Sequence, residues 1–483
     1  MKIFKALLFL LCILFSISCT NQTKKITSAE VKNEIDNYLS KTMELHHIPG
    51  LALAVVEGDK IIYEDYFGKA SLENNAQVDK NTLFRIFSAT KLITSTGVFQ
   101  LIQNGQLNLD DKISKYIADL PPPWQDVKIE NLLSHSSGLP DIIKYESTLT
   151  DKELIGKLSE DNMDFVTGNQ FRYNQTNYWL LAQSIEQVTG MPFDNYILKN
   201  QFDNSTTGVL FSSNSQEIIP NRATRYFYNG KTQEFEKDTN NSGRRGHSGN
   251  GLNITLERFI EWNKKLDDNV LLNNNMKSKM WKPFNFKNQK DNFLYGWGNY
   301  RVNGLNSYGF SGGNLAAFRK FVDHKTTIIL LSNAYEIPAY DIIINDIARI
   351  AIPELKAKNL TMEGEVMNFV INSQFNEATQ SFKKLRRENP NSDFDNLKWN
   401  INRIGNSYLY GEKNPEKALD AFKFNVEANP NWWVSMASLA EVYEIKKDSL
   451  NAIESYKKAI LLNEDNEWNY NEQMKNKIEE LKN

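Results

Sequence analysis

A serine and a lysine three residues apart are the first candidates for chemistry. They are Ser88 and Lys91 in the segment SATK, which lies near the start of a predicted helix over residues 86–104. Side chains three positions apart on a helix share one face, so the hydroxyl and the amine are expected side by side. The partial positive charge of a helix N-terminus favours an alkoxide or oxyanion near Ser88. A lysine withdrawn from water can lose its proton, so the pair predicts a serine nucleophile with Lys91 as its base.

Further stretches extend this pair into a family pattern. Residues 84–91 (FRIFSATK), 100–111 (QLIQNGQLNLDD) and 132–139 (LLSHSSGL) resemble the serine β-lactamases and penicillin-binding proteins. The closest resemblance is to the class C branch, which includes esterases, D-aminopeptidases and D,D-carboxypeptidases. It spans about residues 30–350. The resemblance implies a serine hydrolase that forms an acyl-serine intermediate and needs no metal and no organic cofactor.

The second catalytic element of this family is a Tyr-x-Asn motif, and residues 171–178 (FRYNQTNY) match it. The match implies that Tyr173 exchanges protons with Ser88 and the leaving group, and a protonated lysine nearby would lower the pKa of its phenol. Gln175 stands where the family has asparagine. It keeps the amide but is one methylene longer, so its substrate contacts are expected to shift. The alternative for Tyr173 is an ordinary half-buried aromatic residue.

The third element of the family is a strand that carries Lys-Thr-Gly or His-x-Gly. Residues 308–313 (YGFSGG) lie in the matching place, with Phe310 at the position of the cation and Ser311, Gly312 and Gly313 after it. These four residues are the expected substrate-binding edge. The missing cation argues against efficient penicillin hydrolysis, whereas the backbone N–H groups of Ser88 and Gly313 would still form an oxyanion hole.

Two histidines outside these motifs need a separate interpretation. His135 lies inside the LLSHSSGL segment, where a turn-forming, hydrogen-bonded histidine is expected rather than a general base. His247 follows Arg244 and Arg245 without a motif and is interpreted as a loop residue.

The elements that must position these residues come from both ends of residues 30–355. Helical spacing predicts a helix over 30–44, and β-rich runs follow at 51–56 and 60–68. Strand patterns return near 293–302, 315–322 and 326–332, before an apolar helix at 339–351, whereas residues 129–265 are mostly helical and loop-like. This order predicts an α+β fold: an antiparallel sheet flanked by helices, with an inserted helical lobe and a site in the cleft between them.

Residues 356–483 differ in character from the preceding domain and carry a repeat. Ala418 and Phe422 are matched 34 residues later by Ala452 and Tyr456, and a weaker copy lies around Ala378. This pattern resembles the tetratricopeptide repeat over residues 365–475, and such stacked helix pairs usually bind peptides or protein partners. A helical cap without a partner is the alternative.

The N-terminus predicts export and lipid anchoring. Lys2 and Lys5 precede an apolar run at 6–17, which is shorter than the roughly 20 residues that span a bilayer but suits a signal peptide. The run ends in SISC, which resembles a bacterial lipobox. Residues 1–18 are therefore expected to be removed and Cys19 to carry lipid, with residues 19–29 as a tether. The protein is then a bacterial lipoprotein that faces the periplasm or the cell surface; an ordinary signal peptide is the alternative.

The composition excludes one class of partner and leaves two functions open. A net charge of −3 without a large basic face argues against nucleic acid, so the expected partners are a small-molecule or peptide substrate, the membrane and a possible protein. The first function is a serine hydrolase acting on an ester or amide. The second is a weak or inactive relative that binds peptides or cell-wall fragments, which the deviations at Gln175 and Phe310 motivate.

Overall fold

The computed structural model describes residues 28–482, apart from 230–231, 233, 289–292, 303–304, 314, 336–339, 357–361, 391–393, 465 and 468–469. The predicted signal peptide, Cys19 and most of the predicted tether therefore lie outside the described residues. Among the helices of the described part, none is both long and apolar enough to cross a membrane.

A seven-stranded sheet forms the centre of the first 355 residues, and its order is β3-β2-β1-β12-β11-β10-β9. Its paired strands run antiparallel, as predicted. The strands are β1 (Gly50–Glu57), β2 (Lys60–Ser71), β3 (Ala76–Gln77), β9 (Gly298–Val302), β10 (Leu305–Gly312), β11 (Ala316–Phe321) and β12 (Thr326–Ser332). The N-terminal strand β1 pairs with β12 over its whole length, so the two ends of this domain meet at the middle of the sheet.

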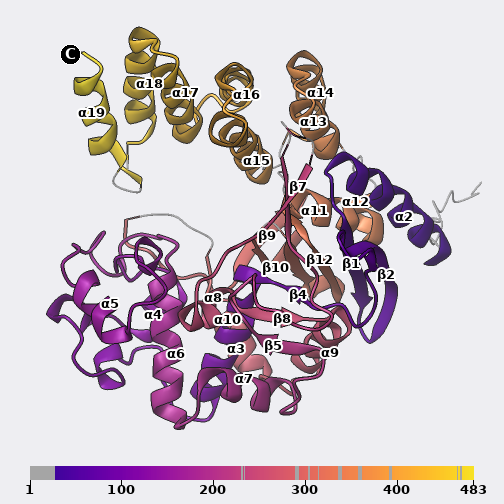
Figure 1. Ribbon diagram of the computed structural model, residues 1–483, viewed down its shortest axis with the longest axis vertical. Coiled ribbons are helices and arrows are strands. Elements are labelled where there is room, and N and C mark those ends of the chain that lie inside the picture. The colour runs from indigo at the N-terminus through magenta and orange to yellow at the C-terminus, as the bar shows by residue number, and fades with distance from the viewer. Residues whose placement is uncertain are drawn as a thin grey trace, which may run out of the picture.

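Both faces of the central strands of this sheet are buried. Alternate side chains of these strands enter two different cores. Leu53 of β1 and Leu330 of β12 pack with α2 (Ser28–Leu45) and α11 (Tyr340–Ala351) on one face. The neighbouring Ala54 and Ile329 face the larger core, where α9 (Leu256–Asp267) packs. Figure 1 shows α2 and α11 on one side of the sheet and the helical lobe on the other. The α+β architecture predicted from the sequence is confirmed.

The inserted lobe supplies further helices and most strands of two small sheets. Its helices are α3 (Thr90–Gln103), α4 (Ile129–Leu133), α5 (Asp151–Leu158), α6 (Gln175–Thr189), α7 (Phe193–Gln201), α8 (His247–Asn250) and α10 (Asn274–Met280). One small sheet joins β4 (Phe84–Arg85), β8 (Leu252–Ile254) and β5 (Val209–Phe211), and the other joins β13 (Ala334–Tyr335), β6 (Tyr226–Asn229) and β7 (Glu234–Lys237).

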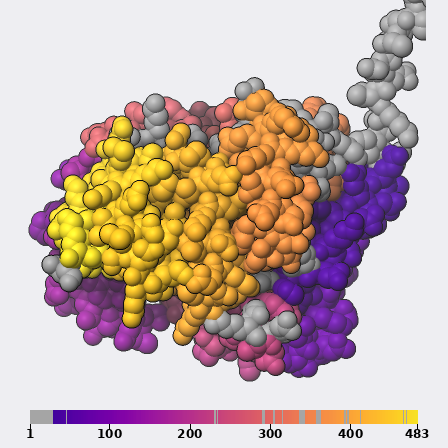
Figure 2. Space-filling model, turned by 90° about the horizontal axis from the view of Figure 1, so that it is seen from above, coloured from indigo at the N-terminus to yellow at the C-terminus, as the bar shows by residue number. Residues whose placement is uncertain are grey.

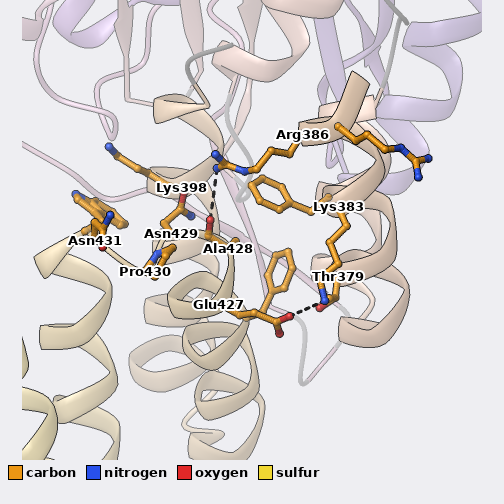
Figure 3. A pocket seen from close by; sticks show the side chains of 13 residues that line it. Thr379, Lys383, Arg386, Lys398, Glu427, Ala428, Asn429, Pro430 and Asn431 are labelled. Carbon is orange, nitrogen blue, oxygen red and sulfur yellow. Dashed lines mark hydrogen bonds and ion pairs between the residues drawn. The ribbon is translucent and has the colours of Figure 1, made fainter. Parts of the chain in front are cut away.

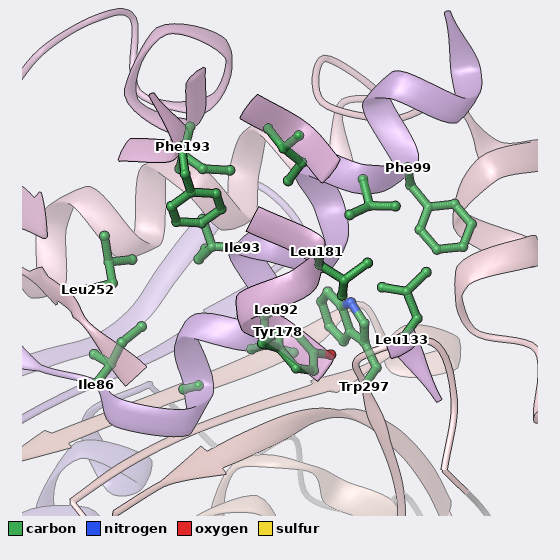
Figure 4. Packing of buried hydrophobic residues seen from close by; sticks show 14 of the residues in the cluster. Ile86, Leu92, Ile93, Phe99, Leu133, Tyr178, Leu181, Phe193, Leu252 and Trp297 are labelled. Atoms are coloured by element: carbon green, nitrogen blue, oxygen red, sulfur yellow. The ribbon is translucent and has the colours of Figure 1, made fainter. Parts of the chain in front are cut away.

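Helix α3 is buried on every side from Thr90 to Leu101, so it is a core helix rather than an amphipathic surface helix. Leu92, Ile93 and Phe99 pack among residues of the lobe and the sheet (Figure 4). Its buried hydroxyls are hydrogen-bonded: Thr94 donates to the Ser248 carbonyl at 2.7 Å. A helix held in this way is a rigid support for residues at its N-terminus.

The C-terminal residues form a stack of helices above the sheet and lobe (Figures 1 and 2). They are α13 (Met362–Ile371), α14 (Phe375–Glu388), α15 (Asp395–Asn406), α16 (Pro415–Ala428), α17 (Trp433–Ile445), α18 (Ser449–Leu462) and α19 (Tyr470–Glu480), after the short α12 (Pro353–Lys356). The repeat predicted from the sequence falls on α14, α16 and α18, where Ala378, Ala418 and Ala452 are fully buried. The helical nature of this part is confirmed, and its identity as tetratricopeptide repeats stays a prediction.

A buried charge network joins the stack to the sheet domain. Arg349 of α11 donates to Asp346 at 2.7 Å and to Glu363 of α13 at 2.9 Å. Tyr38 of α2 donates to the same Asp346 at 2.9 Å. Burial raises the pKa of Asp346 to about 6, although the Arg349 guanidinium opposes this shift. Helix α2, from the start of the domain, therefore meets α11 and α13 at one set of paired charges.

Candidate active site

The proposed nucleophile lies in a strained turn. Ser88 is in the 3-10 turn Phe87–Ala89, directly before α3, and its side chain is half-buried and therefore within reach of a ligand. The preceding Phe87 has a φ of 44°, which is unfavourable for a bulky residue. Its ring lies between two guanidinium groups, with Arg85 at 4.2 Å and Arg225 at 4.5 Å from the ring centre. Such strain is often found where a turn has to present a reactive group.

Two glycines at the end of β10 bring this strand against the nucleophile turn. A Cβ atom on Gly312 would lie 1.8 Å from the Ile86 carbonyl oxygen, and one on Gly313 would lie 2.8 Å from the Phe87 ring. Gly313 also has a φ of 56°. Only glycine allows this close approach, which places the Gly313 backbone beside residues 86–88, as an oxyanion hole shared with Ser88 requires.

The Lys91 amine is fully buried in the lobe. Its Nζ donates to the Gly249 carbonyl at 2.8 Å and to the Gln175 Oε1 at 3.2 Å. It also lies 4.7 Å from the Tyr173 ring centre. Burial lowers the pKa of Lys91 to about 7, against a smaller opposing effect of the Asp141 carboxylate. The expectation that this lysine can lose its proton near neutral pH is thus supported by its surroundings.

The Tyr173 phenol reaches the nucleophile directly, since its hydroxyl donates to the Ser88 Oγ at 2.8 Å. Its ring lies between those of His135, at 4.5 Å, and Phe310, at 6.1 Å. Burial raises the pKa of Tyr173, so the expected lowering by a nearby lysine is wrong. The physical reason is that desolvation dominates, and a lysine with a pKa of about 7 carries only part of its charge at neutral pH. Tyr173 is therefore a protonated donor in the resting site.

Both histidines have partners away from the reacting atoms. His135 is fully buried, and its Nδ1 accepts a hydrogen bond from the Asn174 N–H at 3.2 Å. Burial lowers its pKa well below the usual value, which keeps the ring neutral. His247 begins the short helix α8 instead of lying in a loop, and its Nδ1 contacts the Asp194 carboxylate at 2.9 Å. The interpretation of His135 as a turn-forming, hydrogen-bonded histidine agrees with this geometry and with its φ of 56°.

Gln175, predicted as a substrate-binding residue, contacts the proposed base Lys91. It is the first residue of α6, its N–H donates to Asp141 at 3.2 Å, and its Oε1 accepts from Lys91. Gly249 leaves the room for this longer side chain, because a Cβ atom there would lie 2.7 Å from the Gln175 Oε1. Gln175 also lines a pocket of about 240 Å³ with residues 240–242. Gln175 therefore lies between the Lys91 amine and this pocket.

The edge formed by β10 differs from the family pattern at Phe310. This ring packs against Tyr173 instead of providing a cation. A buried cation that no sequence motif indicated lies on the neighbouring strand: Arg319 of β11 donates through its Nη2 to the Ser311 Oγ at 2.9 Å. Its guanidinium also stacks on the Tyr300 ring at 3.4 Å. The only sequence signal was an arginine within the apolar strand segment AAFRKF.

The three groups on which the sequence-based hypothesis depends lie together. They come from three elements: Ser88 from the nucleophile turn, Lys91 from α3 and Tyr173 from the loop before α6. Tyr173 contacts both of the others, through its hydroxyl to Ser88 and its ring to the Lys91 amine. Among the residues that the structure describes, no group of three or more His, Cys, Asp or Glu side chains is arranged to hold a metal ion.

Comparisons with known proteins identify the family of the sheet and lobe. The family model described as Beta-lactamase matches residues 35–351. Penicillin-binding protein 4* of Bacillus subtilis is 26% identical over 323 residues, which cover 62% of this chain and 71% of that protein. Protein flp of Staphylococcus aureus is 27% identical over 175 residues, so the match spans 34% of this chain and 35% of flp.

Solved structures share the fold at lower identity. A penicillin-binding protein homologue from Pyrococcus abyssi, described as octameric, has a TM-score of 0.58 and 20% identity, and the match covers 69% of this chain and 81% of that chain. A D-amino acid amidase from Ochrobactrum anthropi, complexed with L-phenylalanine amide, has a TM-score of 0.55 and 19% identity, with 68% and 96% covered.

Proposed function

Because the chain belongs to the beta-lactamase family, we propose that it is a serine hydrolase that forms an acyl-enzyme on Ser88. The observation that carries the proposal is the hydrogen bond from the Tyr173 hydroxyl to the Ser88 Oγ, at 2.8 Å, beside the buried amine of Lys91. A nucleophile, a base that is partly neutral at pH 7 and a proton donor are the groups that acyl transfer needs.

The proposed reaction begins with proton transfer from the nucleophile. Neutral Lys91 accepts the Ser88 proton while Oγ bonds to the carbonyl carbon of an ester or amide. The N–H groups of Ser88 and Gly313 then stabilise the oxyanion. Tyr173 gives its proton to the leaving oxygen or nitrogen and recovers a proton from Lys91. Water finally attacks the acyl-serine, releases the acid and returns a proton to Ser88.

Arg319 bears on the substrate class. Arg319 is 1% exposed and donates to the Ser311 hydroxyl, so in this proposal its positive charge acts on a substrate through that hydroxyl. An indirect cation is expected to bind a substrate carboxylate less strongly than a direct one. Neutral esters and amides are therefore the preferred substrates in this proposal, and the phenyl ring of Phe310 offers them an apolar contact.

Active-site labelling tests the proposal. A fluorophosphonate probe should label the wild-type protein, and intact mass should place one adduct on Ser88, whereas Ser88→Ala should stay unlabelled. Turnover of p-nitrophenyl esters, D-amino-acid amides and a chromogenic cephalosporin then identifies the substrate class. Absence of both labelling and turnover in folded wild-type protein would refute the hydrolase.

A specific observation favours a second function, that of a peptide-binding protein with little activity. The Lys91 Nζ is engaged by Gly249 and Gln175, and Phe310 occupies the place of the family cation. This function predicts measurable affinity for a D-alanyl-D-alanine peptide that is unchanged in Ser88→Ala, without turnover in either protein. Turnover by the wild type alone would exclude it.

We also propose that the mature protein is held at a membrane by lipid on Cys19. The apolar run and the SISC segment support this proposal. Metabolic labelling with an alkyne fatty acid should mark the wild type and not Cys19→Ala, which should move to the soluble fraction of the exported proteins. Equal labelling of both proteins would contradict lipid attachment at this residue.

A further inference from the structure

A pocket of about 790 Å³ lies within the C-terminal helical stack, far in sequence from the proposed active site. Its walls are α14 and α16, and the segment 429–432 after α16 forms one side. Phe382 and Phe424, whose ring centres are 6.3 Å apart, are the aromatic residues of the floor. The space is large enough for one or two side chains of a bound peptide, and its floor is apolar.

The rim of this pocket is basic. Lys383, Arg386, Arg387 and Lys398 line it, and Glu427 is the one acid among its described lining residues. Glu427 is already paired with Lys383 at 2.9 Å, so it does not offset the remaining cations. The chain as a whole has a net charge of −3, which makes this cluster a local reversal of sign.

The helix dipole explains part of the cluster but not all of it. Arg386 and Arg387 lie in the last turn of α14, where the carbonyl ends favour cations. Lys398, however, comes from the first turn of α15, where the helix dipole disfavours a positive charge. Lys383 and Arg387 are also four positions apart on α14, a spacing at which like charges repel. Cations from two helices thus surround one space at some electrostatic cost.

Two of the cations are held in defined positions. The Arg386 guanidinium lies 5.0 Å from the Phe382 ring centre and its Nη2 donates to the Ala428 carbonyl at 3.5 Å. The Lys398 amine lies 5.2 Å from the Trp432 ring centre. Figure 3 shows Arg386 bonded to Ala428 on one side of the pocket and Lys383 bonded to Glu427 on the other. Aromatic stacking reduces the side-chain freedom that a ligand would otherwise have to remove.

We propose that this pocket binds an acidic peptide segment of a partner protein. An aromatic or leucine side chain packs onto the floor that Phe382 and Phe424 form. Asp or Glu residues on either side of it pair with Arg387 and Lys398. Charge complementarity selects the acidic segment, and the concave shape with an aromatic floor favours a side chain over a flat lipid surface. The proposal is independent of hydrolysis at Ser88.

A peptide-display selection on the whole mature protein tests the proposal. The probe is a library of random nonapeptides, and the expected result is enrichment of sequences with at least two Asp or Glu residues around an aromatic or leucine residue. The enriched peptide, labelled with fluorescein, should bind in anisotropy measurements. Changing each of its acids to the amide should weaken binding at least tenfold, and so should raising NaCl from 50 to 500 mM.

Two variants and a matched control locate the site. Arg387→Glu combined with Lys398→Glu reverses two charges and should weaken peptide binding by at least tenfold. Thr379→Trp fills the pocket without changing its charge and should do the same. Lys457→Glu combined with Lys458→Glu reverses two exposed charges on α18 and should leave binding unchanged. Circular dichroism of each variant checks folding.

Several outcomes would overturn the proposal. One is a selection without enrichment, or with enrichment of sequences lacking acids. Another is equal peptide binding by the wild type and both pocket variants. A third is the absence of peptide binding together with binding to phosphatidylglycerol vesicles that the charge-reversal variant loses, which would identify an anionic membrane surface as the ligand instead.

Discussion

Replacing Gln175 by glutamate changes one atom group beside the proposed base and should shift the pH dependence of activity. The Gln175 Oε1 is 3.2 Å from the Lys91 Nζ, so a carboxylate there would stabilise the protonated amine. An opposite charge at this distance raises a lysine pKa by about 1–3 units. Burial has lowered the pKa of Lys91 to about 7 in the wild type, so in Gln175→Glu the Lys91 amine should lose its proton only near pH 8–10.

The assay is kcat/KM for the best ester substrate between pH 5 and 10. Wild-type activity should rise with pH to a plateau above about 7, since neutral Lys91 is the active form. In Gln175→Glu the same rise should occur about 1–3 units higher, with about a tenfold to thousandfold loss at pH 6 and recovery at high pH. Gln216→Glu, on an exposed residue, is the control and should follow the wild type.

The opposite change sharpens this test. The Asp141 carboxylate raises the pKa of Lys91 slightly, so Asp141→Asn should move the rise in activity to lower pH. The asparagine keeps an oxygen that can accept the Gln175 N–H. If neither variant shifts the pH profile, or if both shift it in the same direction, Lys91 is not the base and the reasoning fails.

Three further substitutions test other parts of the site. Tyr173→Phe removes the proton donor to Ser88 and should lower kcat by about 10²–10⁴-fold with folding unchanged, whereas a small effect would exclude a role in proton transfer. Gly312→Ala should lower the free energy of unfolding, measured by denaturant titration, by about 2–4 kcal/mol, because its Cβ atom would lie 1.8 Å from a backbone oxygen. Gly156→Ala is the control: its Cβ atom would point into open space on α5, so the change should be neutral or slightly stabilising. Lys91→Met should abolish activity yet raise the free energy of unfolding by about 1 kcal/mol at pH 7. The pKa of Lys91 is lower in the folded protein than in the unfolded chain, so burying its charge costs the wild type most at low pH. The gain in stability from Lys91→Met should therefore shrink as the pH rises towards 10.5.

The sequence predicted the parts of the site that depend on local patterns. Ser88 and Lys91 were found from their spacing, and Tyr173 from its surrounding motif, because each pattern lies within a few residues of the chain. The predicted exchange of a proton between Tyr173 and Ser88 agrees with their hydrogen bond, but the predicted direction of the Tyr173 pKa shift was wrong. Burial of that ring depends on His135 and Phe310, which come from other elements.

The contacts that tune the site could not be predicted from the sequence. The Gly249 carbonyl and Gln175 meet Lys91 only after α6 and α8 pack against α3, and Arg319 reaches Ser311 across two paired strands. The antiparallel sheet built from the two ends of the domain and the helical character of residues 356–483 were predictable because hydrophobic periodicity is repeated over many residues. The basic pocket was not predictable, since its cations come from two helices and packing decides which side of each helix faces the pocket.

The buried charge network of Tyr38, Asp346, Arg349 and Glu363 affects what happens when the sheet domain is produced without the helical stack. Cutting the chain before α13 would remove the Glu363 carboxylate and leave the Arg349 guanidinium, which is only 3% exposed, with less compensation for its charge. Losing one member of a buried ion pair is strongly destabilising, at about 3–5 kcal/mol. We therefore expect a fragment that ends near residue 355 to be less stable than the same residues within the full-length chain. The helical stack and the sheet are separate in architecture, but a carboxylate of the stack compensates a buried charge of the sheet domain.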